Sequence, residues 1–138
     1  MQYIAKIYKE DESFLVEFPD IPGCLTYGNS LEEAMEMAKD ALNGILSVRL
    51  KEKEPLPVSK TKANAKKGFY AIEVECNLAV AYTVFEARRG KSAAGLCRKM
   101  GISRQAFCNF ENPHKSVSIP SLEKLAKALG KRLEISFV

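Results

Sequence analysis

Several features that mark common protein classes are scarce or missing in this chain of 138 residues. It has one histidine, and its four cysteines (Cys24, Cys76, Cys97, Cys108) show no CxxC spacing, so the residues that usually build a metal site are lacking. No apolar run approaches the ~18 residues that a membrane span needs, and the N-terminus MQYIAKIYKEDE is too polar for a signal peptide. We therefore expect a cytoplasmic protein with free thiols, no metal, no cofactor and no membrane association.

Charge is distributed unevenly, although the net charge is only +4. Residues 1–48 carry three basic and nine acidic side chains, a net of −6, residues 49–77 carry seven and four, a net of +3, and residues 78–138 carry eleven and four, a net of +7. A basic C-terminal half suits a phosphate backbone, whereas an acidic N-terminal half suits a basic partner other than DNA. The length allows one domain or two small ones, and the opposite charges indicate two tasks.

The first part of the chain predicts a small antiparallel sheet. Apolar and polar residues alternate at Tyr3–Tyr8 and Phe14–Phe18, as in a hairpin, and Pro19 ends the second strand because it cannot donate to the ladder. A turn at residues 20–23 then leads to a short third strand at Cys24–Tyr27. The alternation at Phe69–Cys76 predicts a fourth strand that pairs back into the sheet.

A helix is predicted between the third and fourth strands. Ser30 followed by Glu33 forms a capping-box pattern. The helix is expected to fade near Lys51, and its inward face would consist of Leu31, Met35, Ala38, Leu42, Ile45 and Leu46. Lys60–Gly68 is rich in lysine and predicts a mobile loop. The expected order over residues 1–76 is therefore β-β-β-α-β.

The segment Ser92–Glu111, SAAGLCRKMGISRQAFCNFE, predicts two short helices joined by a tight turn. Gly101 is placed for a left-handed C-cap, and Ser103 is a natural N-cap for the second helix. Ala106, Phe107 and Phe110 share the inward face, since side chains three and four apart lie together. The outward residues are Arg104, Gln105, Cys108 and Asn109.

This segment resembles the helix-turn-helix of phage-repressor-like domains, in which Arg, Gln and Asn side chains pair with base edges. Cys97, Gly101, Ile102 and Ser103 occupy the positions that are typical of the class, but Ala93 stands where a phosphate-gripping Gln is usual. The alternative is a helical hairpin with no nucleic-acid role. The predicted DNA contacts are Ser92, Ser103, Arg104, Gln105, Cys108, Asn109 and Lys115.

Three further elements complete the C-terminal part. Asn77 is placed to cap a helix over Leu78–Arg88, and Pro120 to occupy the first turn of a last helix. Leu133–Val138 alternates like a strand but has no obvious partner in a helical domain. Because a lone edge strand is poorly stable, we expect it to pair with the same strand of a second copy, as a homodimer or higher oligomer, through Leu133, Ile135 and Phe137.

The run Phe14–Gly28, FLVEFPDIPGCLTYG, followed by LEEA at Leu31–Ala34, resembles the HicB antitoxin family, as does the ending LAKALGKRLEISFV. The resemblance implies an α+β protein: a partial RNase H-like β-β-β-α-β domain over residues 1–76, then a phage-repressor-like helix-turn-helix domain with a C-terminal strand over residues 77–138. The second domain would bind DNA and dimerise.

The resemblance also implies a function. The first domain would cover and occlude a HicA-type toxin, a small basic RNase that cleaves mRNA, and the second would repress the shared operon at its operator. The charge split agrees with both roles. The candidate toxin contacts are the carboxylates Glu17, Asp20, Glu32, Glu33, Glu36 and Asp40.

Two other functions remain open: a stand-alone repressor whose N-terminal domain binds a small ligand, and a metal-dependent nuclease that uses these carboxylates. Against the nuclease, most of the carboxylates fall on an exposed helix face or in turns, where acids are ordinarily solvated. Cys97 and Cys108 on adjacent helices suggest a redox switch, but Cys97 occupies the small-residue position that lets the two helices approach, and packing is the better explanation. The lysines at residues 60–67 and His114 are either solvated or extra phosphate contacts.

Overall fold

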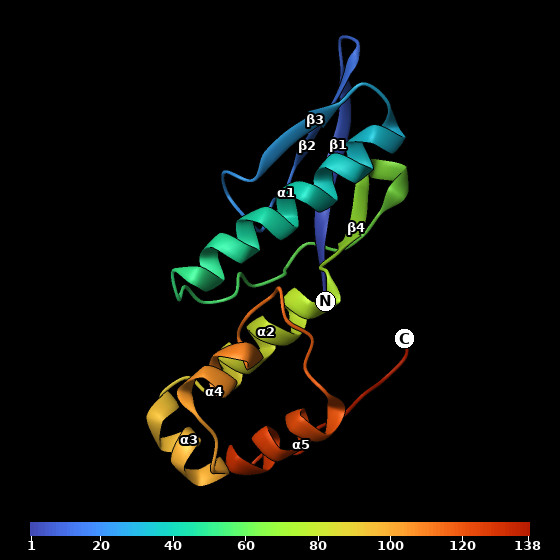
Figure 1. The fold of residues 1–138 in the computed structure, drawn as a ribbon. Helices are drawn as coiled ribbons and strands as arrows, with labels where there is room; N and C mark the ends of the chain where they lie inside the picture. Colours follow the sequence, from blue (N-terminus) through green and yellow to red (C-terminus); the bar gives the residue numbers. More distant parts are fainter. The chain divides into compact units, whose positions relative to one another are not determined.

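The computed structural model describes residues 1–138 and divides into two compact units, Met1–Cys76 (unit 1) and Asn77–Val138 (unit 2) (Figure 1). Unit 1 contains the strands β1 (Gln2–Glu10), β2 (Ser13–Glu17), β3 (Leu25–Gly28) and β4 (Phe69–Glu73), the helix α1 (Leu31–Lys51) and the short 3-10 helix η1 (Ala65–Lys67). The four strands form one antiparallel sheet in the order β3-β2-β1-β4. The predicted order β-β-β-α-β is therefore the observed one.

The core of unit 1 lies between the sheet and α1. Tyr3, Ala5 and Ile7 of β1 are buried as predicted, together with Val16 of β2, and Ile4 on the opposite face of β1 is buried as well. From α1 the buried residues are Ala34, Ala38, Leu42, Asn43, Leu46 and Leu50. The prediction that Leu31 faces inward is wrong, because this side chain is exposed and the small Ala34 takes the inward position where the helix begins.

Close contact between β3 and α1 explains why small residues occupy positions 28 and 34. A Cβ added at Gly28 would lie 2.4 Å from the backbone nitrogen of Ala34, so no larger residue fits at the end of β3. The Oγ of Ser30 accepts a hydrogen bond from Glu33 N (3.1 Å), as predicted for the cap. The return bond of the capping box differs, since the Glu33 carboxylate accepts from Asn29 N rather than from the cap residue (3.1 Å).

The segment between α1 and β4 is more ordered than the sequence suggested. Instead of a loop without structure, residues 60–68 include η1, and Asn64 exchanges backbone hydrogen bonds with Phe69. Gly68 O also accepts a bond from Ile7 N (2.8 Å), which extends the pairing along β1. Gly68 is thereby joined to a residue that lies far away in the sequence, and composition alone does not reveal this bond.

Unit 2 contains four helices, α2 (Cys76–Ala87), α3 (Ala93–Met100), α4 (Arg104–Phe110) and α5 (Ile119–Ala128). Its core consists of Val84, Leu96, Cys97, Phe107, Phe110, Leu125, Ala128 and Leu129. The predicted cap at Asn77 is wrong, because α2 already begins at Cys76 and Asn77 lies in its first turn. Its side-chain amide instead donates to Ser116 Oγ at 3.5 Å.

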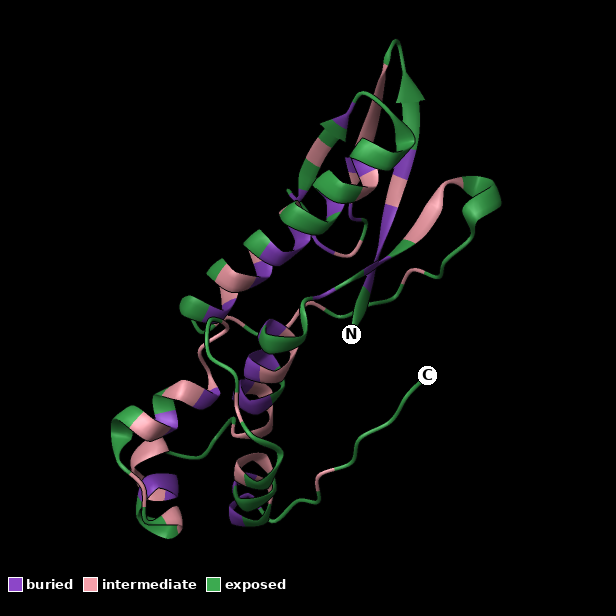
Figure 2. Ribbon diagram, turned by 45° about the vertical axis from the view of Figure 1, so that its right-hand side comes forward, coloured by how far each residue is buried: buried purple, intermediate pink, exposed green.

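The last residues of the chain form no strand within this structure (Figure 2). Ile135 is 61% exposed, and Phe137 and Val138 are fully exposed. The expectation of a final strand is therefore wrong for the single chain, because a β ladder needs a second strand to accept and donate its hydrogen bonds, and residues 131–138 have no such neighbour. Pairing with a second copy stays a prediction.

Candidate functional site

The α3–α4 pair of unit 2 is built from local caps. Ser92 Oγ accepts from Gly95 N (3.0 Å), and Ser103 Oγ accepts from Ala106 N (3.1 Å), so serine caps both helices. Gly101 closes α3 with a φ of 68°, the left-handed conformation that glycine adopts without strain. Ile102 N then donates to Cys97 O (3.0 Å), and this bond completes the turn between the helices. The predicted cap at Ser103 and the predicted C-cap glycine are confirmed, while the cap at Ser92, where the first helix was predicted to begin, is an additional finding.

The two faces of α4 separate packing from exposure. Phe107 and Phe110 are buried with ring centroids 6.1 Å apart, while Arg104, Gln105 and Cys108 are exposed and Asn109 is half-buried. The exposed side therefore presents a guanidinium and an amide, groups that can pair bidentately with guanine and adenine edges. Lys115 is also exposed, in the loop after α4.

A partly buried ion pair joins the end of α4 to α2. The guanidinium of Arg88 donates to both carboxylate oxygens of Glu111, with Nη2 at 2.9 Å from Oε1, and both side chains are only 17% exposed. The same guanidinium lies over the rings of Phe85 and Phe107, at 5.7 and 5.6 Å from their centroids. The hydrogen bonds to Glu111 raise the pKa of Arg88, although burial acts in the opposite direction. Sequence patterns did not indicate this pair, because its partners are 23 residues apart.

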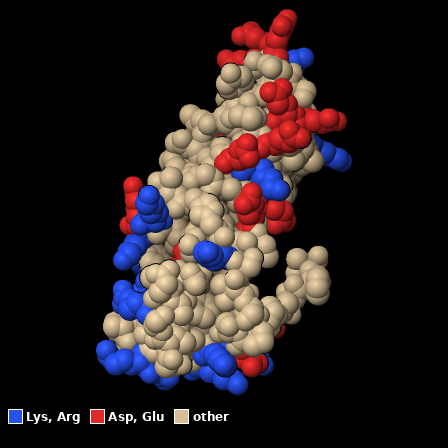
Figure 3. Space-filling model, in the orientation of Figure 1, with Lys and Arg blue, Asp and Glu red and all other residues tan.

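Charges of one sign dominate parts of each unit (Figure 3). The figure shows lysine and arginine side chains over the helices of unit 2, and carboxylates over α1 and the β1–β2 turn of unit 1. On α1 the exposed carboxylates of Glu32, Glu36 and Asp40 are four residues apart and therefore form one stripe, which we call the α1 stripe. Glu33 is exposed beside them and also caps the helix.

The two remaining candidate carboxylates of unit 1 have partners inside the unit. Glu17 lies 4.0 Å from Lys6 on the neighbouring strand. Asp20 accepts three hydrogen bonds, from Lys60 N (2.9 Å), Thr61 N (2.9 Å) and Thr61 Oγ1 (3.0 Å). Burial alone would raise the pKa of Asp20, but the bonds from Thr61 and Lys60 outweigh it and hold the pKa below its ordinary value. Asp20 thus fastens the loop after α1 to the turn after β2.

No group of three or more His, Cys, Asp or Glu side chains in the structure could hold a metal ion. None of the helices is both long enough and apolar enough to cross a membrane. Of the four cysteines, Cys24 and Cys97 are buried, Cys76 and Cys108 are exposed, and all four are free thiols. Burial raises the pKa of the Cys24 thiol.

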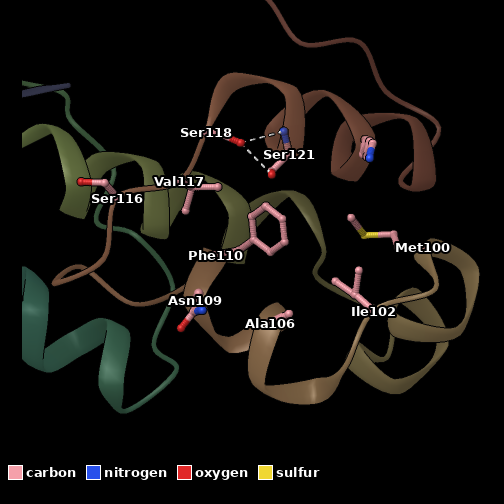
Figure 4. Close-up of a pocket in the computed structure, with 10 residues that line it drawn as sticks. Met100, Ile102, Ala106, Asn109, Phe110, Ser116, Val117, Ser118 and Ser121 are labelled. Carbon is pink, nitrogen blue, oxygen red and sulfur yellow. Dashed lines mark hydrogen bonds between the residues drawn. The ribbon is translucent and has the colours of Figure 1, made fainter.

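Unit 2 also contains a cavity of about 320 Å³ between α4 and α5 (Figure 4). Met100, Ile102 and Phe110 supply its apolar wall, while Asn109 and Ser121 add polar atoms. The hydroxyl of Ser121 accepts a hydrogen bond from Ser118, the residue that caps α5 (2.7 Å). The alternative of a repressor with a ligand-binding N-terminal domain predicts a cavity in unit 1, whereas this cavity lies in unit 2.

Comparison with known proteins places this fold in a family. A family model described as a HicB-like antitoxin of a bacterial toxin–antitoxin system matches residues 3–89. The chain is 31% identical over 139 residues to Antitoxin HicB 2 of Photorhabdus laumondii subsp. laumondii, with 98% of this chain and 95% of the relative covered. It is 32% identical over 127 residues to Antitoxin HicB of Escherichia coli strain K12, with coverages of 91% and 90%.

Among solved structures, a chain of a HicA3 and HicB3 toxin–antitoxin complex is similar with a TM-score of 0.44 and 26% sequence identity, over 54% of this chain and 99% of that one. The family model covers more than half of the residues, and the two named relatives match almost from end to end. This chain therefore belongs to the family of HicB-like antitoxins of bacterial toxin–antitoxin systems.

Proposed function

We propose that this protein neutralises a HicA-type RNase toxin with unit 1 and represses its own operon with unit 2. The observation that carries the proposal is the separation of charge between two compact units of an antitoxin-family chain, a net of −3 over unit 1, whose residues 1–48 alone carry −6, and a net of +7 over unit 2. One surface that attracts a basic protein and another that attracts DNA suit a protein that holds both partners at once.

For the toxin, neutralisation proceeds by occlusion. A protein bound over the RNA-binding surface of an RNase blocks substrate without any chemical step of its own. The carboxylates of Glu17, Glu32, Glu33, Glu36 and Asp40 provide the negative potential that attracts such a surface, which must itself be basic to bind RNA. Asp20 is left outside this contact set, because its carboxylate already accepts three hydrogen bonds from the loop at residues 60–61.

For DNA, α3 and α4 act as a helix-turn-helix with α4 as the recognition helix. Arg104, Gln105 and Asn109 contact base edges, and Cys108 lies among them. Ser92, Ser103 and Lys115 contact the phosphate backbone, the serines through hydroxyl hydrogens that their capping bonds leave available. We also propose that the β-β-β-α-β arrangement of unit 1 is a partial RNase H-like fold.

Operator binding requires two copies. Leu133, Ile135 and Phe137 alternate along the exposed C-terminal segment, and pairing of this segment with its equivalent in a second copy would satisfy its backbone groups and cover its apolar side chains. A two-fold dimer then contacts an inverted repeat whose half-sites are about one helical turn apart.

The toxin half of the proposal is tested by co-expressing this chain with the HicA-type toxin from the same locus and measuring complex formation and residual RNase activity. We expect a stable complex and loss of activity. A soluble, folded chain that neither binds the toxin nor lowers its activity would contradict the proposal.

The DNA half is tested by measuring affinity for the operator and for random DNA of equal length. Arg104→Ala or Gln105→Ala should weaken operator binding by ~1–3 kcal/mol and relax base preference at one position, with little change on random DNA. Lys115→Ala is the matched control, since loss of a phosphate contact weakens both DNAs alike. Equal losses on both DNAs for the α4 variants would mean that these residues contact phosphates instead of bases.

A further inference from the structure

The sheet of unit 1 has two faces, and α1 lies across only one of them (Figure 1). The contact between Gly28 and the backbone of Ala34 identifies the covered face, because a Cβ at Gly28 would point into the helix. Side chains alternate between faces along a strand. Tyr27, the neighbour of Gly28, therefore lies on the opposite face, together with every residue that is in register with it.

The register identifies the rest of this second face, which we call the open face. Tyr8, Leu15 and Tyr27 form one row across β1, β2 and β3. The next row contains Phe69, Lys6, Glu17 and Leu25. Although they belong to a sheet, Tyr8 is 40% exposed, Tyr27 60% and Leu25 67%, while Leu15 and Phe69 are half-buried. Ile4 has the same orientation in β1 but is only 6% exposed. The open face is therefore exposed at the end that carries Tyr8, Leu25 and Tyr27, where it presents a contiguous group of aromatic and aliphatic side chains to solvent.

The charged groups of the open face favour a basic partner. The register places the side chains of Glu10, Glu17 and Glu73 on the same side of the sheet as Tyr8. Lys6 is the one cation on this side, so the net charge of the open face is −2. Lys6 is already engaged, 4.0 Å from Glu17 and with its ammonium 5.6 Å from the centroid of the Tyr8 ring. Two open faces of equal negative charge repel each other, so a second copy is a poor occupant.

We propose that the open face is the surface on which the RNase toxin docks, with Tyr8 and Tyr27 as its anchors. This inference rests on the proposed function and names the contact surface within it. Tyrosine is enriched among the residues that dominate binding energy, because it provides a large rigid contact area with a polar tip. A Lys or Arg of the RNA-binding surface can lie over such a ring and pair with the nearby carboxylates at the same time.

The α1 stripe then has a different role from the open face. Glu32, Glu36 and Asp40 lie on the solvent side of the helix that covers the other face, where the apolar neighbours Leu31 and Met37 are less exposed (40% and 37%) than Tyr27 and Leu25 of the open face (60% and 67%). Charges without desolvated contacts mainly change the rate of encounter and its dependence on salt. The open face should therefore control the dissociation rate of the complex, and the α1 stripe at most its association rate.

The experiment measures association and dissociation rates of the full-length chain with a catalytically inactivated HicA-type toxin. Tyr8→Thr and Tyr27→Thr keep a residue that favours strands, and each should raise Kd at least 10-fold, mainly through faster dissociation. Glu32→Gln with Glu36→Gln on the α1 stripe is the comparison variant: it should slow association at low salt and change the dissociation rate less than 3-fold. Circular dichroism checks that every variant is folded.

A second measurement needs no variant. Hydrogen exchange of the wild-type complex should show slower exchange in β1, β2 and β3 than in the free chain, with no change in the outer positions of α1. Wild-type chain that does not bind the toxin would overturn the proposed function itself. A wild-type complex whose affinity survives both tyrosine substitutions, or whose protection falls on α1, would overturn the open-face inference alone.

Discussion

The ion pair between Arg88 and Glu111 should control how firmly α4 is held in unit 2. Glu111 is the residue at which α4 ends, and Arg88 follows α2, so their two hydrogen bonds join these helices. Glu111→Gln leaves the guanidinium without its counter-ion in a site where both side chains are 17% exposed. Loss of one partner from a buried pair costs ~3–5 kcal/mol, and we expect the low end, about 3 kcal/mol, because some solvent reaches the site.

Hydrogen exchange of the α4 amides in the full-length chain measures this effect locally. About 3 kcal/mol corresponds to exchange that is roughly 100-fold faster, since every ~1.4 kcal/mol is a factor of ten. Glu123→Gln is the matched control, because the Glu123–Lys127 pair has side chains that are 61% and 75% exposed. Exposed pairs of this kind contribute ~0.3–0.5 kcal/mol.

A double-mutant cycle separates the ion pair from general packing. Arg88→Met with Glu111→Leu removes both charges, and the double variant should be more stable than the sum of the single losses predicts, because neither charge is left unpaired. The reasoning is refuted if exchange in α4 rises no more in Glu111→Gln than in Glu123→Gln. Strictly additive single losses would likewise show that the two side chains are not coupled.

Three further changes test other parts of the structure. Asp20→Asn should remove the stability that the Asp20 carboxylate provides. This contribution is fully present above the ordinary carboxyl pKa of ~3.9 and is lost as the pH falls through the lowered pKa of the folded state. The free energies of unfolding of the wild type and the variant should therefore converge at low pH. Gly28→Ala should destabilise unit 1 by ~1–3 kcal/mol in urea unfolding, because the added methyl group overlaps the backbone of Ala34, whereas Gly44→Ala, with open space around it, should not. Deletion of Ile135–Val138 should abolish dimerisation and operator binding in sedimentation and DNA-binding assays while toxin binding persists. A deletion variant that remains a tight operator-binding dimer would refute the role of this segment.

Local sequence determined much of the secondary structure of this protein. The caps at Ser30 and Ser103 and the left-handed Gly101 follow from interactions within three or four residues, so pattern alone predicted them and the structure confirms them. The family prediction, which depended on the run Phe14–Gly28, is likewise confirmed. Charge segregation is also a property of sequence, because net charge does not depend on how the chain folds.

Contacts between residues far apart in the sequence were decided only by tertiary structure. The bonds from Lys60 and Thr61 to Asp20 span about 40 residues, and no local pattern indicates that the turn and the loop meet. Leu31 has helical spacing for the core, yet the close approach at Gly28 selects Ala34 instead. The exposure of Tyr27 depends on which face of the sheet α1 covers, because alternation specifies two faces without saying which one is buried.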